Sequence, residues 1–296
     1  MKKKKIAFII NPISGLISKD TIPSLIKQEL DLNRFEPEII FTKYAGHASK
    51  LAIEYISKNY DSIIAVGGDG TVNEVALVVK QTQSTLGIVP IGSGNGLARH
   101  LGISLNVKRA IQDLNSAQVS KIDYCLLNNK PFFCTAGVGF DAFVSQEFGK
   151  VKKRGPITYL EKVVKSYFSY EPQTYNLEYE GKNIQTEAFL ITAANASQWG
   201  NDAYIAPKAS IKDGLIDITI LKSFPIFESP VVTFDMFTKN FNANRHVETI
   251  KTKEIIITHE KEIPFHLDGE PLGEAKQFHI KVVPKGIGVF CGRNFQ

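Results

Sequence analysis

A glycine-rich segment placed directly after a short apolar run is the feature that most restricts how this chain folds. The segment reads GGDGTVNEV at residues 67–75, and the preceding SIIAV is typical of a buried strand. Glycines let the backbone turn through positive φ and bring main-chain N–H groups close to an anion, and the start of a helix presents more of them. The segment therefore predicts a phosphate-binding turn between a strand and a helix.

A second segment of the same kind reads PIGSGNGLAR at residues 90–99 and follows the apolar run LGIV. A helical pattern comes after it, as after the first segment. Parallel strands end at the same edge of their sheet, so loops on neighbouring strands meet there. The two segments together predict loops that close on one nucleotide.

The two segments resemble the catalytic domain of the diacylglycerol and sphingosine lipid kinases. The first segment is shared with NAD kinases and phosphofructokinases, and the second narrows the resemblance to lipid kinases. Matches continue in order along almost the whole chain: NPISG at 11–15, TKYAGHA at 42–48, AGVGFDA at 136–142, KDGLID at 212–217 and LDGE at 267–270. The resemblance implies an ATP- and Mg²⁺-dependent lipid kinase. An NAD kinase-like enzyme and a catalytically silent lipid-binding regulatory protein stay open as alternatives.

The pattern of apolar runs predicts two domains. Over residues 1–125, short β-branched runs alternate with helical patterns, which is typical of an α/β domain with a parallel sheet, and residues 285–296 are expected to complete it. Over residues 126–284, strand-like runs follow one another at short spacing, which predicts an all-β domain interrupted by a helix at 159–168. This helix either packs on the sheet or faces lipid at the membrane interface. By resemblance, the first domain is NAD kinase- or phosphofructokinase-like and the second is a lipid-binding β-sandwich.

The resemblance implies that ATP binds where the first strands end. Asp69 is also expected to be catalytic, because its carboxylate can meet Mg²⁺ or polarise the phosphates. The segment NPISG follows the first strand and Thr42 ends the second, so both are expected at the same sheet edge. The expected nucleotide-binding residues are Asn11, Pro12, Ile13, Ser14, Gly15, Thr42, Gly67, Gly68, Asp69, Gly70, Thr71, Val72, Asn73 and Ser93.

The motif LDGE supplies the other catalytic candidates, Asp268 and Glu270. Alternate positions of an extended chain point to the same side, so the two carboxylates are expected to lie together. The family pattern assigns the proton-accepting role to Glu270, with Asp268 as its partner. A polar hairpin turn is the alternative interpretation of the same residues.

The segment SIKDGL at residues 210–215 resembles a structural magnesium loop. By resemblance, the ligands are the main-chain carbonyls of Ser210 and Leu215 and the carboxylate of Asp213. Oxygen ligands suit this hard cation. The alternative is an ordinary turn that opens a strand, because Asp-Gly turns are common.

Two further features of the sequence are the residue at position 96 and the histidines. Gly96 stands where many bacterial diacylglycerol kinases carry an aspartate, which leaves open both the lipid and the carboxylate that holds a catalytic metal. The six histidines show no ligand spacing, and we interpret them as structural or surface groups.

Composition predicts a cytoplasmic protein that meets membranes transiently. Three scattered cysteines fit neither a disulfide framework nor a zinc site, and no apolar run approaches the ~20 residues of a membrane span. The net charge of +5 suits an anionic lipid surface better than a nucleic acid. Lys150, Lys152, Lys153 and Arg154 form a basic cluster that either contacts lipid or is a solvated face. The sequence leaves the oligomeric state open, a homodimer included.

Overall fold

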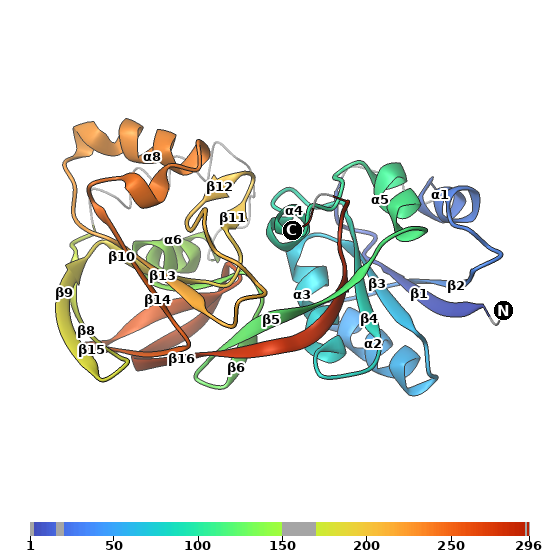
Figure 1. Ribbon diagram of the computed structural model, residues 1–296, viewed down its shortest axis with the longest axis horizontal. Coiled ribbons are helices and arrows are strands. Elements are labelled where there is room, and N and C mark those ends of the chain that lie inside the picture. The colour runs from blue at the N-terminus through green and yellow to red at the C-terminus, as the bar shows by residue number, and fades with distance from the viewer. Residues whose placement is uncertain (1–2, 16–20, 150–169, 294, 296) are drawn as a thin grey trace. The chain divides into compact units, whose positions relative to one another are not determined.

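The computed structural model describes residues 3–15, 21–149, 170–293 and 295, and the chain divides into two compact units (Figure 1). Unit 1 comprises Met1–Asp123, Gly200–Asp202 and Pro284–Gln296. Unit 2 comprises Tyr124–Trp199 and Ala203–Val283. No sequence signal pointed to the short piece Gly200–Asp202 as part of unit 1. Its place there follows from contacts with Gly94, whose carbonyl accepts the Asn201 N–H at 3.2 Å.

Unit 1 is built on a parallel sheet in the order β16-β4-β3-β1-β2. Strand β1, which lies between β3 and β2, is buried on both faces, since residues 6–10 are at most 1% exposed. A continuous β-branched run of this kind is typical of parallel strands covered by helices. The strands that contribute to unit 1 are β1 Lys4–Ile10, β2 Phe35–Phe41, β3 Ser62–Gly67, β4 Thr85–Pro90, β5 Val119–Leu127, and the end of β16 Glu270–Phe290.

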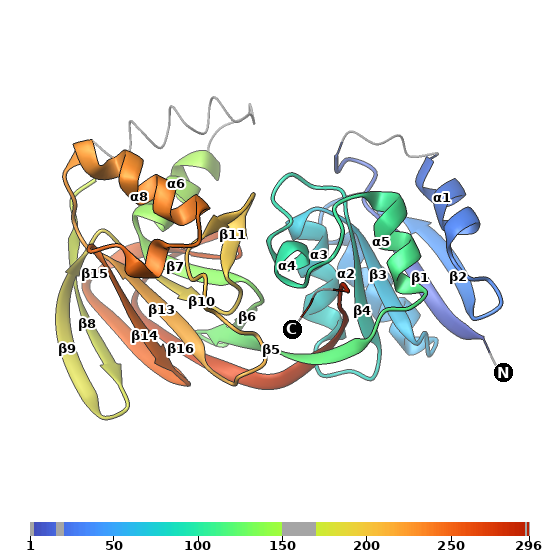
Figure 2. The same cartoon turned by 45° about the horizontal axis from the view of Figure 1, so that its top comes forward.

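Two pairs of helices cover this sheet: α1 packs with α5, and α2 packs with α3. Figure 2 shows α1 and α5 near the sheet on one side. Alternate β1 residues pack with α1 and α5, and the side chain of Asn106 caps α5 by accepting the Arg109 N–H at 3.0 Å. The helices of unit 1 are α1 Thr21–Glu29, α2 His47–Ser57, α3 Asp69–Val79, α4 Gly96–His100 and α5 Val107–Leu114.

Unit 2 is built on antiparallel strands in the order β14-β13-β10-β7-β15-β16, with the β8–β9 hairpin beside β15. Inward-facing residues alternate along these strands, for example Ile216, Ile218 and Ile220 in β13. The remaining strands are β6 Lys130–Phe132, β7 Thr135–Gly139, β8 Gln173–Tyr179, β9 Lys182–Ala188, β10 Leu190–Ala194, β11 Gln198–Gly200, β12 Ala203–Tyr204, β13 Ile216–Leu221, β14 Val247–Thr252 and β15 Glu254–Leu267.

Unit 2 also contains helices that the sequence analysis did not predict. They are α6 Phe140–Gly149 and α8 Ser229–Phe237, with short 3₁₀ turns η1 Ile226–Glu228 and η2 Phe241–Ala243. The predicted helix at 159–168 and the basic cluster at 150–154 lie outside the described residues. The predicted fold class, a parallel α/β domain followed by a domain of antiparallel strands, is confirmed.

Candidate functional site

Four strands of unit 1 end at one edge of the sheet, where their following residues are joined by main-chain hydrogen bonds. The Asn11 N–H donates to Val66 O at 2.9 Å, the Thr42 N–H to Ile10 O at 2.8 Å, and the Ile91 N–H to Gly67 O at 3.0 Å. The parallel register of β1, β2, β3 and β4 produces this arrangement. The structure therefore brings the predicted nucleotide-binding segments together at one edge.

The first glycine loop (residues 67–71) and the second glycine loop (residues 92–96) touch through their main chains. A Cβ atom at Gly92 would lie 2.5 Å from the Cα of Gly68, which is too close for any side chain. Gly15 has a φ of 71°, and a Cβ there would lie 2.2 Å from the carbonyl oxygen of Ile91. Glycine is required at these positions because another stretch of main chain fills the space of a side chain.

The carboxylate of Asp69 links the two glycine loops. Its Oδ2 accepts the N–H of Asn95 and its Oδ1 accepts the N–H of Gly96, both at 2.8 Å. Gly96 is the first residue of α4, so the carboxylate bonds N–H groups that have no partner within the helix. Asp69 thus has a structural contact that the sequence did not predict. Its direct action on phosphate or magnesium stays a prediction.

Asn95 holds the second glycine loop in shape from within. It adopts a φ of 54°, its Oδ1 accepts the Gly92 N–H at 3.2 Å, and its Nδ2 donates to Gly92 O at 2.7 Å. Asparagine tolerates this left-handed conformation better than most residues. The loop therefore presents its exposed Ser93 from a fixed backbone.

Asn11, the predicted residue that directly follows β1, forms a small hydrogen-bond network of its own. Nδ2 of Asn11 donates to the hydroxyl of Thr71 at 3.0 Å, and Oδ1 of Asn11 accepts the Ile13 N–H at 3.0 Å. Thr71 is buried, whereas Gly70 is exposed and has no atom within 4 Å of the place a Cβ would take. Space beside Gly70 is what a ligand that approaches the main chain requires.

Glu74 is a residue of this edge that the sequence analysis missed. Its carboxylate accepts the N–H of Gly46 at 2.8 Å and of Ala48 at 2.9 Å, and so caps α2. Glu74 lies in the first matched segment, but its partners lie near position 47, and nothing in either segment signals the pairing. It ties the loop after β2 to α3.

In unit 2, the Asp-Gly-Glu turn (residues 268–270) joins β15 to β16 as a tight hairpin. Asp268 has a φ of 49° and Gly269 a φ of 82°, and Leu267 pairs with Glu270 across the turn. Two consecutive positive φ values are typical of a type I′ turn. The expectation of an extended chain with both carboxylates on one side is therefore wrong, because Asp268 occupies the turn and Glu270 begins the next strand.

The Asp268 carboxylate points to main-chain N–H groups. It accepts hydrogen bonds from Phe133 at 3.0 Å, Cys134 at 2.7 Å and Thr135 at 3.1 Å. Burial raises the pKa of Asp268 from its ordinary value of 3.8 to about 6, and the three N–H donors oppose this rise. Glu270 is exposed at the start of β16. Proton acceptance by Glu270 stays a prediction.

His266 and Asp141 are a second pair that the sequence analysis missed. His266 is buried, and its Nε2 lies 3.0 Å from Oδ2 of Asp141. The interpretation of the histidines as structural or surface groups did not foresee a contact with a carboxylate beside the Asp-Gly-Glu turn. Asp141 lies in the matched segment AGVGFDA, which was the available signal.

The predicted magnesium loop has a cationic side chain at its carboxylate. Oδ1 of Asp213 accepts the Leu215 N–H at 3.1 Å, and Nζ of Lys251 lies 2.9 Å from Oδ2 of Asp213 and 3.4 Å from Oδ2 of Asp217. A metal ion at that oxygen would meet a like charge at close range. Magnesium binding by this loop stays a prediction, and in the described part of the chain no three acidic, histidine or cysteine side chains cluster as metal ligands.

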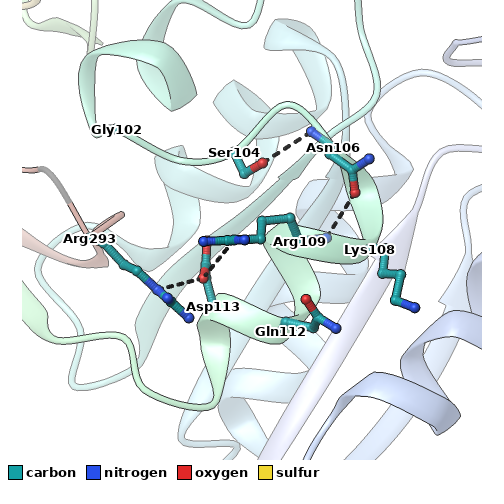
Figure 3. A pocket seen from close by; sticks show the side chains of 8 residues that line it. All are labelled: Gly102, Ser104, Asn106, Lys108, Arg109, Gln112, Asp113 and Arg293. Carbon is teal, nitrogen blue, oxygen red and sulfur yellow. Dashed lines mark hydrogen bonds and ion pairs between the residues drawn. The ribbon is translucent and has the colours of Figure 1, made fainter.

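A polar pocket of about 630 Å³ lies elsewhere in unit 1 (Figure 3). Its cations are engaged by carboxylates: Nε of Arg293 lies 2.9 Å and Nε of Arg109 3.8 Å from Asp113, and Lys108 lies 3.1 Å from Glu29. None of the predicted site residues lines it. Its lining residues are Gly102, Ser104, Asn106, Lys108, Arg109, Gln112, Asp113 and Arg293.

Two family models match the chain, one after the other. Residues 5–127 match the diacylglycerol kinase catalytic domain, and residues 134–291 match the YegS C-terminal NAD kinase beta sandwich-like domain. The second match identifies the antiparallel domain as the predicted β-sandwich.

Individual relatives agree with the family models. The chain is 30% identical over 274 residues to the diacylglycerol kinase of Bacillus subtilis, covering 90% of each chain. It is 29% identical to a Yersinia enterocolitica protein named as a candidate YegS-like lipid kinase, covering 83% of this chain and 81% of that one. A crystal structure of a candidate diacylglycerol kinase from Bacillus anthracis superposes with a TM-score of 0.84 at 26% identity, covering 100% of this chain and 99% of that one.

Proposed function

Because the chain belongs to the diacylglycerol kinase family, which includes the YegS-like lipid kinases, we propose that it transfers the γ-phosphate of ATP to a lipid hydroxyl. Diacylglycerol is the first acceptor to test, and sphingoid lipids are the second. The kinase activity and the lipid acceptor rest on the family, the nucleotide donor on the glycine loops, and the metal on the chemistry of phosphoryl transfer.

The observation that carries the proposal is the packed edge formed by the two glycine loops. Their main chains touch at Gly68 and Gly92, and Asp69 fixes the second loop through two N–H groups. A rigid glycine edge with open space beside Gly70 suits the close approach of phosphate oxygens to main-chain N–H groups. This edge supports ATP as the phosphate donor.

Glu270 is the proposed proton acceptor. The lipid hydroxyl oxygen forms a bond to the γ-phosphorus while the bond from that phosphorus to the bridging oxygen breaks. ADP leaves with the bridging oxygen, and the hydroxyl proton passes to the Glu270 carboxylate. The proposed role of Asp268 is to anchor the turn, since its carboxylate binds three main-chain N–H groups.

We propose that Mg²⁺ takes part as the MgATP complex, since phosphoryl transfer requires a cation against the phosphate charges. This ion arrives with the substrate and is separate from the loop at Asp213. At position 96, where many bacterial diacylglycerol kinases are expected to carry an aspartate, this chain has a glycine. Gly96 has no carboxylate to offer a metal ion, and its main-chain N–H donates to the Asp69 carboxylate.

We also propose that the protein is cytoplasmic and binds transiently to the surface of an anionic membrane. In the described part of the chain, no helix is both long enough and apolar enough to span a bilayer. Phe227 (77% exposed) in η1 and Phe234 (64%) in α8 recur at helical spacing with the exposed residues Val231 and Phe237. Exposed apolar side chains at helical spacing support insertion into the lipid interface.

Vesicle sedimentation tests this membrane contact. The double variant Phe227→Ser with Phe234→Ser should bind vesicles of anionic lipid about tenfold more weakly, because it removes two large apolar side chains from the interface. The exposed residue Ile53, on the helix α2 of unit 1, provides the matched control as Ile53→Ser. Equal binding by the double variant and the parent would contradict contact through α8.

The proposed function is tested with labelled ATP and a panel of acceptors in mixed micelles: diacylglycerol, monoacylglycerol, ceramide, sphingosine and, as the soluble alternative, NAD. We expect transfer to at least one lipid, dependence on Mg²⁺, and none to NAD. Transfer to NAD alone would replace the proposal with an NAD kinase. Transfer to no acceptor, with lipid binding retained, would identify a regulatory lipid-binding protein.

A further inference from the structure

His266 lies two residues before the Asp-Gly-Glu turn and is only 2% exposed. The N–H of Gly269 donates to its Nδ1 at 3.3 Å. Its Nε2 lies 3.0 Å from Oδ2 of Asp141, a residue 125 positions away in the sequence. The imidazole ring therefore connects the central glycine of the turn to a carboxylate on α6.

The Asp141 carboxylate is itself held on several sides. Its Oδ1 accepts the Ala142 N–H at 2.8 Å, and its Oδ2 accepts the hydroxyl of buried Thr192 at 2.9 Å as well as facing His266. Strand β7 places Gly137 opposite His266, where a Cβ would lie 2.3 Å from the carboxylate and 2.7 Å from the ring. The contact between ring and carboxylate thus depends on a glycine in the partner strand.

These contacts define which ring nitrogen carries the proton. A main-chain N–H can only donate, so Nδ1 of His266 must be the unprotonated acceptor for Gly269. The proton of the neutral ring then sits on Nε2 and is donated to Asp141. A carboxylate that orients an imidazole in this way fixes both its tautomer and its direction.

We propose that His266 is a positioning residue of the kinase reaction, which holds the Asp-Gly-Glu turn through Gly269 and thereby directs Glu270. This inference rests on the proposed function, because it requires that Glu270 accept the proton of the lipid hydroxyl. Asp141 and Thr192 act through His266, by fixing the ring.

The turn then has two independent attachments. Asp268 is attached through the N–H groups of residues 133–135, and Gly269 is attached through His266. Glu270 follows at once, so both attachments set where its carboxylate lies. Small displacements of a group that accepts a proton lower kcat strongly, because transfer requires alignment within a fraction of an ångström.

A matched pair of variants separates the two contacts of the ring. The oxygen of an asparagine side chain can take the place of Nδ1, so His266→Asn keeps an acceptor for Gly269 and loses the bond to Asp141. The nitrogen of a glutamine side chain can take the place of Nε2, so His266→Gln keeps the bond to Asp141 and loses the acceptor for Gly269. Both variants remove the ring, so the loss of packing is common to them.

The inference expects His266→Gln to lower kcat by about tenfold or more and to leave the KM for ATP within about twofold of the parent. His266→Asn should stay within about threefold of the parent in kcat. Thermal unfolding of both variants measures the structural cost. Parental kcat in the Gln variant, or an equal loss in both variants at similar stability, would overturn the inference.

Asp141→Asn provides a second test that leaves the ring in place. An amide that donates to Nε2 would move the ring proton to Nδ1, which can no longer accept from Gly269, so kcat should fall as in the Gln variant. Nitrogen NMR of the imidazole should show protonation at Nε2 in the parent, and protonation at Nδ1 there would overturn the inference. If the parent transfers phosphate to no acceptor, the proposed function has failed, whereas an active parent with an equally active Gln variant contradicts the positioning role alone.

Discussion

The glycine edge of unit 1 and the Asp-Gly-Glu turn of unit 2 are both organised by an aspartate whose carboxylate binds main-chain N–H groups. Asp69 accepts two such groups and Asp268 accepts three. The source of those groups differs. The partners of Asp69 lie in the second glycine loop, whereas the partners of Asp268 lie in residues 133–135, outside the matched segments. The glycine edge is therefore formed by two matched segments that bind each other, whereas the Asp-Gly-Glu turn is held by residues that belong to no matched segment.

The comparison also separates two kinds of acidic residue. Asp69 and Asp268 use their carboxylate oxygens to hold loops, by accepting hydrogen bonds from main-chain N–H groups. Glu270 is exposed and follows an anchored turn. We therefore expect catalytic proton transfer to depend on Glu270 and loop geometry to depend on the two aspartates.

The largest expected effect is that of Glu270→Gln. The amide keeps the shape of the side chain but cannot accept the lipid hydroxyl proton, so kcat should fall about 10²- to 10⁴-fold. Calorimetry should show MgATP binding close to that of the parent. Glu274→Gln, on the same strand, is the matched control. Loss of nucleotide binding in the Glu270→Gln variant would move this residue from proton transfer to the nucleotide site.

Asp69 distinguishes a loop anchor from a direct phosphate or metal contact. Asp69→Ala removes the acceptor of the Asn95 and Gly96 N–H groups, and we expect a loss of about 10²-fold in kcat/KM. Asp69→Asn keeps one acceptor oxygen and should recover part of this loss if the residue is an anchor. Asp61→Asn, at the opposite end of β3, is the control.

Equal loss in Asp69→Ala and Asp69→Asn, at unchanged thermal stability, would show that Asp69 is not a loop anchor of the kind that Asp268 is. The carboxylate charge itself would then act on phosphate or magnesium. An anchor role instead requires that both variants unfold at a lower temperature than the parent, with the Asn variant intermediate.

Much of unit 1 could be predicted because its contacts follow from topology. Apolar runs marked the strands, and parallel strands must bring the segments after Ile10 and Gly67 to one edge. The bond from Asp69 to Gly96 could not be predicted, since both belong to motifs that looked like ligand contacts. Glu74 was missed for another reason: its partners sit on a loop whose distance from α3 only the packed sheet determines.

Unit 2 was less predictable because its site depends on antiparallel register. Whether Asp268 lies in a turn or on a strand depends on two φ angles, and the Asp-Gly pair supported either interpretation. The contact of His266 with Asp141 requires β7 to pair with β15 so that Gly137 faces the ring. The spacing of residues in the sequence does not indicate that these two strands pair. Helices α6 and α8 were missed because the strand signals around them dominated the pattern.

The stability of the protein should depend on pH through Asp268. Its pKa in the folded protein, about 6, is above its ordinary value of 3.8, so the folded state binds the proton more tightly than the unfolded chain does. The contribution of the protonated form is fully present below about pH 4 and is lost as the pH rises through 6. Asp268→Asn resembles the protonated form and lacks this dependence.

Chemical unfolding of the parent and Asp268→Asn at several pH values measures this difference. The free energy of unfolding of the parent should fall relative to that of the variant between pH 4 and pH 7, by at most about 3 kcal/mol. A difference that is independent of pH would mean that the three N–H donors fully offset the burial of the carboxylate.

Lys251 extends the comparison to a third aspartate, Asp213, whose carboxylate is held by one main-chain N–H and one ammonium group. If Lys251 supplies the positive charge of this loop, the melting temperature of the parent should be the same in EDTA and in Mg²⁺. Lys251→Met leaves Asp213 and buried Asp217 without that cation and should lower the melting temperature by about 3 °C. Added Mg²⁺ should then restore part of the loss, since two carboxylates attract a divalent ion once the ammonium group is gone.

Lys222→Met, which breaks the exposed pair with Glu248 in the same unit, should show neither effect. A parent protein that loses stability in EDTA would show that the loop binds metal beside Lys251, as the resemblance implies, and that an ammonium group 2.9 Å from the carboxylate does not exclude the ion.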